Sequence, residues 1–231
     1  MKDKFPCVTF DCYGTLIDWE SGIKNTIRTI LDDKGVKGDI EQLFRTREDL
    51  EFDLIQSEYR EYREILALSL KETFVQFQLP YSNRDGERLA ESVPDWPVFS
   101  DTVKSLVRIG RVSRVCIISN IDKDIIARTR DRLGVRFDLI VTAQEARSYK
   151  PSIRPFQLAL GKLKVRSSEV LHVSSGFRYD IPPARQLGFN TAWVNRKREK
   201  APVGFSADYE FSNLVELADF LEKNERSDKV V

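Results

Sequence analysis

The stretch that decides the fold covers residues 5–19 and reads Phe-Pro-Cys-Val-Thr-Phe-Asp-Cys-Tyr-Gly-Thr-Leu-Ile-Asp-Trp. Its first part is apolar, as in a buried strand, and it ends abruptly at Asp11 before the chain turns through Gly14 and Thr15. A carboxylate at the end of a buried strand is costly unless it is hydrogen-bonded, ion-paired or used in a reaction. The ends of strands in an open α/β sheet are also where ligands bind. Asp11 is therefore the first candidate for a functional residue.

Strand-like and helix-like patterns alternate along the rest of the chain. Short apolar runs follow at residues 114–118, 137–141, 169–173, 191–194 and 208–211. Helical patterns occupy residues 101–109, 122–133, 153–163, 178–187 and 213–223. This alternation predicts an α/β fold with a parallel sheet and helices on both of its faces.

Residues 20–92 interrupt this alternation, because they show helical stripes such as Ile23, Ile27 and Ile30 and no convincing strand. The run at 93–97 contains two prolines and ends the helical region. We expect an all-helical cap at residues 19–94, inserted into a core formed by residues 1–18 and 95–231. A cap that follows the first strand lies above the carboxyl edge of the sheet, where it can exclude water from a site. The alternative is a helical decoration without a gating role.

Composition excludes several classes of function. The chain has 231 residues, with 37 basic and 36 acidic side chains and a net charge of +1, which favours neither nucleic acid nor an anionic membrane as a partner. No apolar segment approaches the ~20 residues of a membrane span, and Met1-Lys2-Asp3-Lys4 leads directly into the first strand, so we expect no signal peptide. The three cysteines are expected to be reduced thiols in a cytoplasmic protein. One histidine without a Cys-x-x-Cys pair does not favour structural zinc.

Polar residues follow four of the predicted strands. Each cluster alone has an ordinary explanation as a helix cap or a solvated lysine. Their joint position at the carboxyl ends of successive strands predicts that they converge on one crevice. The candidates are Asp11, Thr15, Ser119, Asn120, Lys150, Ser174, Ser175 and Asp180.

Four motifs in order give the chain its resemblance to a known family. They are Phe-Asp-Cys-Tyr-Gly-Thr-Leu at 10–16, Ile-Ser-Asn at 118–120, Ser-Tyr-Lys-Pro at 148–151, and His-Val-Ser-Ser at 172–175 with Asp180. With the helical cap between the first two, the chain resembles the haloacid dehalogenase superfamily over essentially its full length. The resemblance implies a Rossmann-like core in which Asp11 is a covalent nucleophile.

Two positions narrow the resemblance. Phosphatases of this superfamily carry an acid two residues after the nucleophile to protonate the leaving alkoxide, and they bind magnesium partly through a Gly-Asp pair in the fourth motif. Here Tyr13 and the pair Ser174-Ser175 stand at those places. Losing a general acid costs about 10²–10⁴ in rate, but a halide leaves without protonation. The chain therefore resembles the L-2-haloacid dehalogenases, which need no metal or other cofactor.

The resemblance implies a role for each residue. Asp11 displaces the halide and forms an ester, while Lys150 and Thr15 hold Asp11 ionised, since an adjacent cation lowers a carboxylate pKa by ~1–3 units. Ser119 and Asn120, with nearby backbone N–H groups, bind the substrate carboxylate. Cys12 and Tyr13 complete the predicted substrate-binding set, although strand alternation points the Cys12 thiol away from Asp11. Asp180 orients or deprotonates the hydrolytic water, and Ser175 helps to position Asp180 or Lys150.

The cap is expected to supply an arginine for the departing halide. Arg45 and Arg47 both qualify, and we favour Arg45 because it follows an aromatic residue, Phe44, as the arginine of the family does. One departure concerns the fourth motif. Family members read Ser-Ser-Asn, with an acid three residues after the asparagine. Here Gly176 stands in place of the asparagine, and Asp180 follows it by four residues, so the spacing is one residue longer. A magnesium-dependent phosphatase, a related hydrolase with another substrate and a scaffold without activity on haloacids are the alternatives. The resemblance also suggests a homodimer.

Overall fold

A six-stranded, wholly parallel sheet forms the centre of the computed structural model, which describes residues 4–226. The strands are β1 (Cys7–Phe10), β2 (Arg114–Ser119), β3 (Leu139–Thr142), β4 (Val170–Ser174), β5 (Asn190–Val194) and β6 (Tyr209–Phe211). Their order in the sheet is β3-β2-β1-β4-β5-β6. This is the doubly wound order in which the chain changes direction between β1 and β4, and a ligand crevice is expected at that point. The α/β, Rossmann-like prediction is confirmed.

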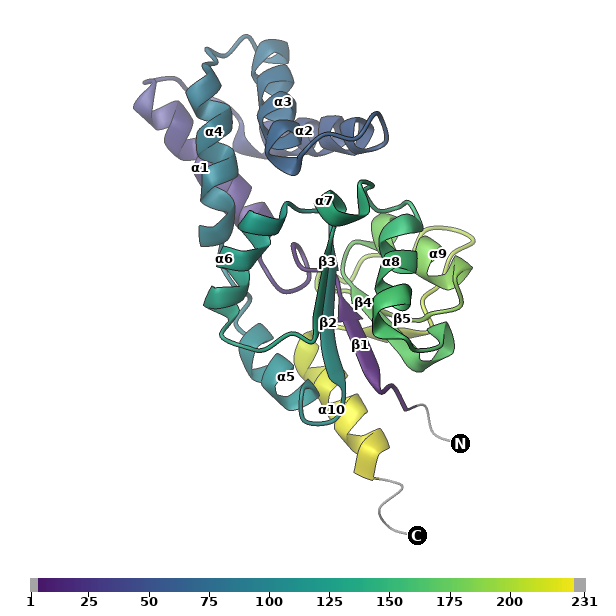
Figure 1. The fold of residues 1–231 in the computed structure, drawn as a ribbon. Coiled ribbons are helices and arrows are strands. Elements are labelled where there is room, and N and C mark those ends of the chain that lie inside the picture. The colour runs from purple at the N-terminus through teal and green to yellow at the C-terminus, as the bar shows by residue number, and fades with distance from the viewer. Residues whose placement is uncertain (1–3, 227–231) are drawn as a thin grey trace.

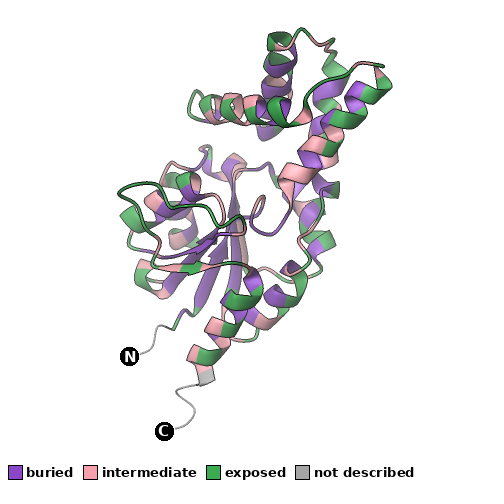
Figure 2. Cartoon of the chain, turned by 180° about the vertical axis from the view of Figure 1, so that it is seen from behind, coloured by how far each residue is buried: buried purple, intermediate pink, exposed green. Residues whose placement is uncertain are grey.

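Helices cover both faces of the sheet (Figure 1). One face carries α5 (Thr102–Ile109), α6 (Lys123–Leu133) and α10 (Leu214–Arg226), and the other carries α8 (Arg154–Leu163) and α9 (Phe177–Gln186). The short helices α7 (Ala143–Ala146) and η2 (Ser167–Glu169) lie in connections. Figure 2 shows that the strands are buried and that the helices around them have exposed outer surfaces.

Four helices follow β1 without an intervening strand. They are α1 (Trp19–Asp33), α2 (Ile40–Ile55), α3 (Tyr62–Gln76) and α4 (Asn83–Ser92), followed by the turn η1 (Val93–Asp95). In Figure 1 α2 and α3 lie above the carboxyl edge of the sheet, while α1 and α4 run down towards the core. The expected all-helical insert is thus present, and the division at residues 18/19 and 94/95 stays a prediction.

A buried carboxylate of the core fixes the cap. Asp122, which precedes α6, accepts hydrogen bonds from the backbone N–H groups of Tyr62 (2.9 Å) and Arg63 (3.0 Å). These N–H groups lie at the first turn of α3, where a helix has no internal acceptors and favours negative charge. The start of α3 is therefore bound directly to the edge of the sheet.

Alternation along β1 separates two hydrophobic layers. Val8 and Phe10 belong to the large core cluster that continues into the cap, whereas Cys7 packs with Phe156, Phe189 and other residues beneath α8 and α9. After β1 the chain turns sharply at Gly14, whose φ of +104° is strained for any residue with a side chain. This turn brings Thr15 back beside Asp11.

Candidate active site

Asp11 is held at the switch point of the sheet by two side chains. Its backbone N–H donates to the Val173 carbonyl (2.9 Å), which extends the pairing of β1 with β4 by one residue. The Lys150 Nζ donates to Oδ1 (2.8 Å) and the Thr15 hydroxyl donates to Oδ2 (2.9 Å). The side chain is almost completely buried, with 7% of the residue exposed. Asp11, Thr15 and Lys150, three of the predicted site residues, therefore form one cluster.

Lys150 has an acceptor for each of its three ammonium protons. Its Nζ donates to Asp11 Oδ1, to Asp180 Oδ1 (2.7 Å) and to the Ile118 carbonyl (3.0 Å). The Asn120 side chain fixes the backbone of Lys150 through two bonds, accepting from its N–H (2.7 Å) and donating to its carbonyl (2.9 Å). The amide of Asn120, expected to bind substrate, is therefore engaged in positioning the lysine.

Asp180 is the second carboxylate bound to Lys150 and is also buried. Its Oδ1 accepts from Lys150 and from His172 Nε2 (2.8 Å), and its Oδ2 accepts from the Ser174 hydroxyl (2.9 Å). Neither His172 nor the Ser174 hydroxyl was given a role by the sequence. Their signal was present, because His172 and Ser174 alternate on β4 and so point to one face of the sheet.

Burial and charge act differently on the two carboxylates. Burial raises the pKa of Asp11 above its ordinary value and outweighs the opposing effect of the Lys150 ammonium. Burial also acts to raise the pKa of Asp180, but Lys150 and the His172 hydrogen bond hold that pKa below its usual range. The pKa of Lys150, which burial alone would lower, is raised by Asp11 and Asp180. Lys150 and Thr15 act on the pKa of Asp11 in the expected direction, but they do not overcome the effect of burial.

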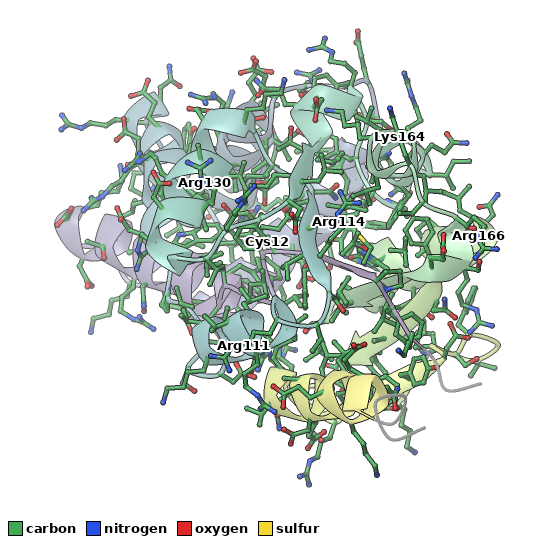
Figure 3. The ribbon with its side chains drawn as sticks, turned by 60° about the horizontal axis from the view of Figure 1, so that its bottom comes forward. Cys12, Arg111, Arg114, Arg130, Lys164 and Arg166 are labelled. Carbon is green, nitrogen blue, oxygen red and sulfur yellow. The ribbon has the colours of Figure 1, made fainter. Side chains whose placement is uncertain are left out.

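The remaining predicted residues lie around this cluster. Ser119 is buried at the end of β2. The Ser175 N–H donates to Thr15 Oγ1 (2.9 Å), while its buried hydroxyl has no hydrogen-bond partner among residues 4–226. Cys12 is wholly buried in the large core cluster, away from the side of Asp11, and Figure 3 shows it in the interior of the molecule.

The Tyr13 side chain points to helix α6. Its hydroxyl is 2.8 Å from the Thr129 hydroxyl, and its ring meets Trp96 edge-on at a centroid distance of 5.9 Å. Burial raises the pKa of Tyr13 well above its ordinary value, which makes the phenol a still weaker acid. Tyr13 is thus a wall of the site and not a proton donor placed at Asp11.

The two candidate arginines of the cap differ in exposure and in their partners. Arg45 is exposed, with 74% of its side chain accessible, and pairs with Glu41 one turn away. Arg47 is fully buried on α2, and its Nε, Nη1 and Nη2 have no hydrogen-bond partner among the described residues. Its guanidinium contacts the carboxylate of Glu51, which accepts a hydrogen bond from the Tyr62 hydroxyl (2.9 Å). The structure leaves Arg45 exposed and does not bring it to the site, so our preference for it is corrected, and Arg47 is the remaining candidate.

Arg47 lies on α2, the cap helix that packs against the start of α9. Burial lowers the pKa of its guanidinium. Tyr179, in the first turn of α9, precedes Asp180 in the chain. The Tyr179 ring packs edge-on against Phe52 of α2 at 5.3 Å. The first turn of α9 and the helix α2 therefore meet above the carboxylate cluster.

The donor set around Asp11 does not suit a magnesium ion. Asp11 and Asp180 both bind the ammonium of Lys150, and the neutral hydroxyl of Ser175 is the next oxygen of the fourth motif. Within the described residues, no group of three or more His, Cys, Asp or Glu side chains lies close enough to hold a metal. None of the helices in residues 4–226 combines the length and apolar character needed to cross a membrane.

Comparison with known proteins agrees with this geometry. The model of the haloacid dehalogenase-like hydrolases matches residues 5–188. An (S)-2-haloacid dehalogenase 4A of Burkholderia cepacia is 27% identical over 97% of this chain and 98% of its own length. The (S)-2-haloacid dehalogenase 2 of Pseudomonas sp. strain CBS-3 is 30% identical over 93% and 94%. The L-2-haloacid dehalogenase of Xanthobacter autotrophicus shares the fold, with a TM-score of 0.80, 20% identity and 94% and 98% coverage. The chain therefore belongs to the haloacid dehalogenase-like hydrolase family.

Proposed function

We propose that the protein is a hydrolase of carbon–halide bonds, an (S)-2-haloacid dehalogenase that acts on short 2-haloacids without a metal. The observation that carries this proposal is the Tyr13 hydroxyl, which contacts Thr129, so position 13 supplies no general acid at Asp11. A leaving group that departs as a stable anion needs no proton, whereas an alkoxide does. The relatives, named as (S)-2-haloacid dehalogenases, support the same substrate class.

The first step is a displacement at the carbon that bears the halogen. An Asp11 oxygen attacks this carbon from the side opposite the halogen, the carbon–halogen bond breaks, and the halide leaves with the bonding electrons. Asp11 is then esterified to the 2-carbon of the acid. Lys150 and Thr15 fix the carboxylate and thereby lower the cost of orienting it for attack.

Arg47 receives the departing halide in this proposal. A buried cation with unpartnered N–H groups stabilises an anion that develops next to it, because the site excludes water. The substrate carboxylate binds at the edge of β2, through Ser119 and backbone N–H groups near Asn120 and Cys12. The ring of Tyr13 closes the apolar side of the site.

Hydrolysis of the ester completes the cycle. Water attacks the carbonyl carbon of esterified Asp11, the 2-hydroxy acid leaves, and the carboxylate returns with the loss of one proton. Asp180 Oδ2 accepts one hydrogen bond from Ser174, so one lone pair remains to orient this water beside Gly176 and Ser175. The three free cysteines favour a reducing, cytoplasmic location, and the family resemblance suggests a homodimer.

Halide release from L-2-chloropropionate, measured with and without a chelator, tests the proposal. We expect release that the chelator does not change and that Asp11→Asn abolishes. Phosphate release from a phosphomonoester, lost on chelation, would instead establish a magnesium-dependent phosphatase. Absence of both activities would favour a scaffold or a hydrolase with another substrate. Dehalogenation by the Asp11→Asn variant would contradict the covalent route.

A further inference from the structure

His172 is the only histidine of the chain, and both of its ring nitrogens are engaged. Its Nδ1 is 2.9 Å from the Thr9 hydroxyl and its Nε2 is 2.8 Å from Asp180 Oδ1. Thr9 lies directly beside it, because these two residues are register partners of β1 and β4. The rings of Phe156 and Phe189 meet the imidazole edge-on at 5.0 and 6.4 Å. The imidazole is therefore fixed in both direction and plane.

The direction of these bonds follows from the acceptor. An ionised carboxylate only accepts hydrogen bonds, so Nε2 carries a proton and donates it to Asp180. The same oxygen of Asp180 accepts from Lys150, whose Nζ also donates to Asp11. A continuous series of buried hydrogen bonds therefore joins the Thr9–His172 pair to Asp11.

We propose that His172 is a positioning residue for the displacement reaction, acting through Asp180 and Lys150 on Asp11. This proposal rests on the proposed function, in which Asp11 is the nucleophile. Without the imidazole, Asp180 Oδ1 keeps only the lysine and Oδ2 only the Ser174 hydroxyl, so the orientation of the carboxylate about its Cβ–Cγ bond is less restricted. Lys150 then follows Asp180 and no longer holds Asp11 Oδ1 at its present distance. The partners of a catalytic group matter in this way in metal sites, where their loss costs about 10–100-fold in activity.

Packing alone is the competing explanation, since a buried histidine between two phenylalanines also fills space. The two explanations differ in their consequences for charge. The groups that face the imidazole are Thr9 of β1, Asp180 of α9, Phe156 of α8 and Phe189, and only Asp180 among them is ionisable. If His172 acts through Asp180, its removal must change the titration of that carboxylate. If it only packs, an apolar residue of similar size leaves the titration unchanged.

The experiment compares His172→Leu, His172→Gln and Phe189→Leu in the full chain. We expect His172→Leu to lower kcat for halide release about 10–100-fold, with KM changed far less. Its pH profile should shift, because Asp180 loses a donor that favours its ionised form. The Gln variant, whose amide can donate to Asp180, should restore most of kcat. Phe189→Leu removes apolar packing beside the ring and should leave the pH profile unchanged.

Carboxyl ¹³C NMR titration of Asp11 and Asp180 provides a reading that needs no turnover. We expect the Asp180 titration to move to higher pH in His172→Leu and to return towards the wild-type value in His172→Gln. Unchanged kinetics and unchanged titration in a folded His172→Leu variant would overturn the proposal. If His172→Leu does not fold, normal titration and poor kcat in the Gln variant would also overturn it. A wild type that releases no halide, together with a shifted Asp180 titration in His172→Leu, would refute the proposed function. His172 would then remain a residue that positions Asp180.

Discussion

Two buried cations, Lys150 in the core and Arg47 in the cap, have opposite surroundings. Lys150, at the edge of the sheet, donates to two carboxylates and a backbone carbonyl. Arg47, in the cap, has three guanidinium nitrogens without a hydrogen-bond partner among the described residues and contacts Glu51 alone. Burying an unsatisfied cation is expensive. The difference supports the proposal that Arg47 receives the halide, because its guanidinium still has N–H groups to donate, whereas Lys150 has none.

The largest contrast is expected when each cation is replaced by methionine. Lys150→Met leaves Asp11 and Asp180 buried without a counter-ion, and breaking such a pair typically costs about 3–5 kcal/mol. For a chain of this size we expect the Tm to fall by roughly 6–20 °C at neutral pH. The fall should shrink in acid, where the carboxylates are protonated. Thermal unfolding by circular dichroism from pH 4 to pH 8 measures both effects.

Arg47→Met serves as the matched variant. It breaks one ion pair, with Glu51, which keeps its bond from Tyr62, whereas Lys150→Met breaks two, so we expect a smaller loss of unfolding free energy than for Lys150→Met. A loss of stability as large as that of Lys150→Met would show that Arg47 is a structural partner of Glu51. The contrast between Lys150, whose partners are all within the protein, and Arg47, which has N–H groups left for an anion, would then be wrong.

The activity of cap variants tests which arginine receives the halide. Removing a group that stabilises a developing anion costs about 10²–10³ in kcat, and we expect a loss of this size for Arg47→Met. Arg45→Met is the matched control, because Arg45 is exposed on the same helix and should keep wild-type activity. Sodium bromide should raise the Tm of the wild type and of Arg45→Met but not of Arg47→Met. The reverse pattern would restore Arg45 as the halide-binding residue.

The fold was accessible from sequence because its signals are local. Each of the six predicted strands overlaps an observed strand. The four-residue helix α7 and, within the cap, helix α4 were not indicated by a periodic pattern of their own. The alternation of apolar strand patterns with amphipathic helix patterns was therefore enough to predict the α/β fold.

The site was less accessible because side-chain direction depends on the helix face and on long-range partners. Successive helical residues turn by 100°, so Arg45 and Arg47 lie on nearly opposite sides of α2. The apolar stripe of Leu43 and Phe44 is one turn before Arg47, and this stripe predicts that Arg47 is the buried one of the two arginines. Alternation on β4 places His172 on the same face as Ser174, but the bond from His172 to Asp180 could not be predicted, since it depends on how α9 packs on β4.

Asparagine substitutions of the two carboxylates should change stability in opposite directions. Burial holds the pKa of Asp11 above that of the unfolded chain, so its ionised form weakens the fold at neutral pH and the penalty vanishes as pH falls through the folded pKa. The pKa of Asp180 is depressed, so its ionised form contributes stability that is lost in acid.

We therefore expect Asp11→Asn to raise the unfolding free energy at pH 7. Asp180→Asn should lower it. Urea unfolding over a series of pH values from neutral into acid measures both differences. The Asp11 difference should diminish first, and the Asp180 difference should diminish only below the ordinary pKa of a carboxyl group. Destabilisation by Asp11→Asn equal to that of Asp180→Asn would show that Lys150 binds the two carboxylates equivalently.

The smallest effect is expected for Tyr13→Phe, which removes only the hydroxyl that contacts Thr129. A part-buried hydrogen bond contributes about 0.5–1.5 kcal/mol, so the Tm should fall by a few degrees. Halide release should stay within about threefold of the wild type, because losing a general acid would instead cost about 10²–10⁴. Thr129→Val breaks the same bond from α6 and should give the same small loss of stability. A large loss of kcat in Tyr13→Phe but not in Thr129→Val would make the phenol a proton donor, and a halide would no longer be the favoured leaving group.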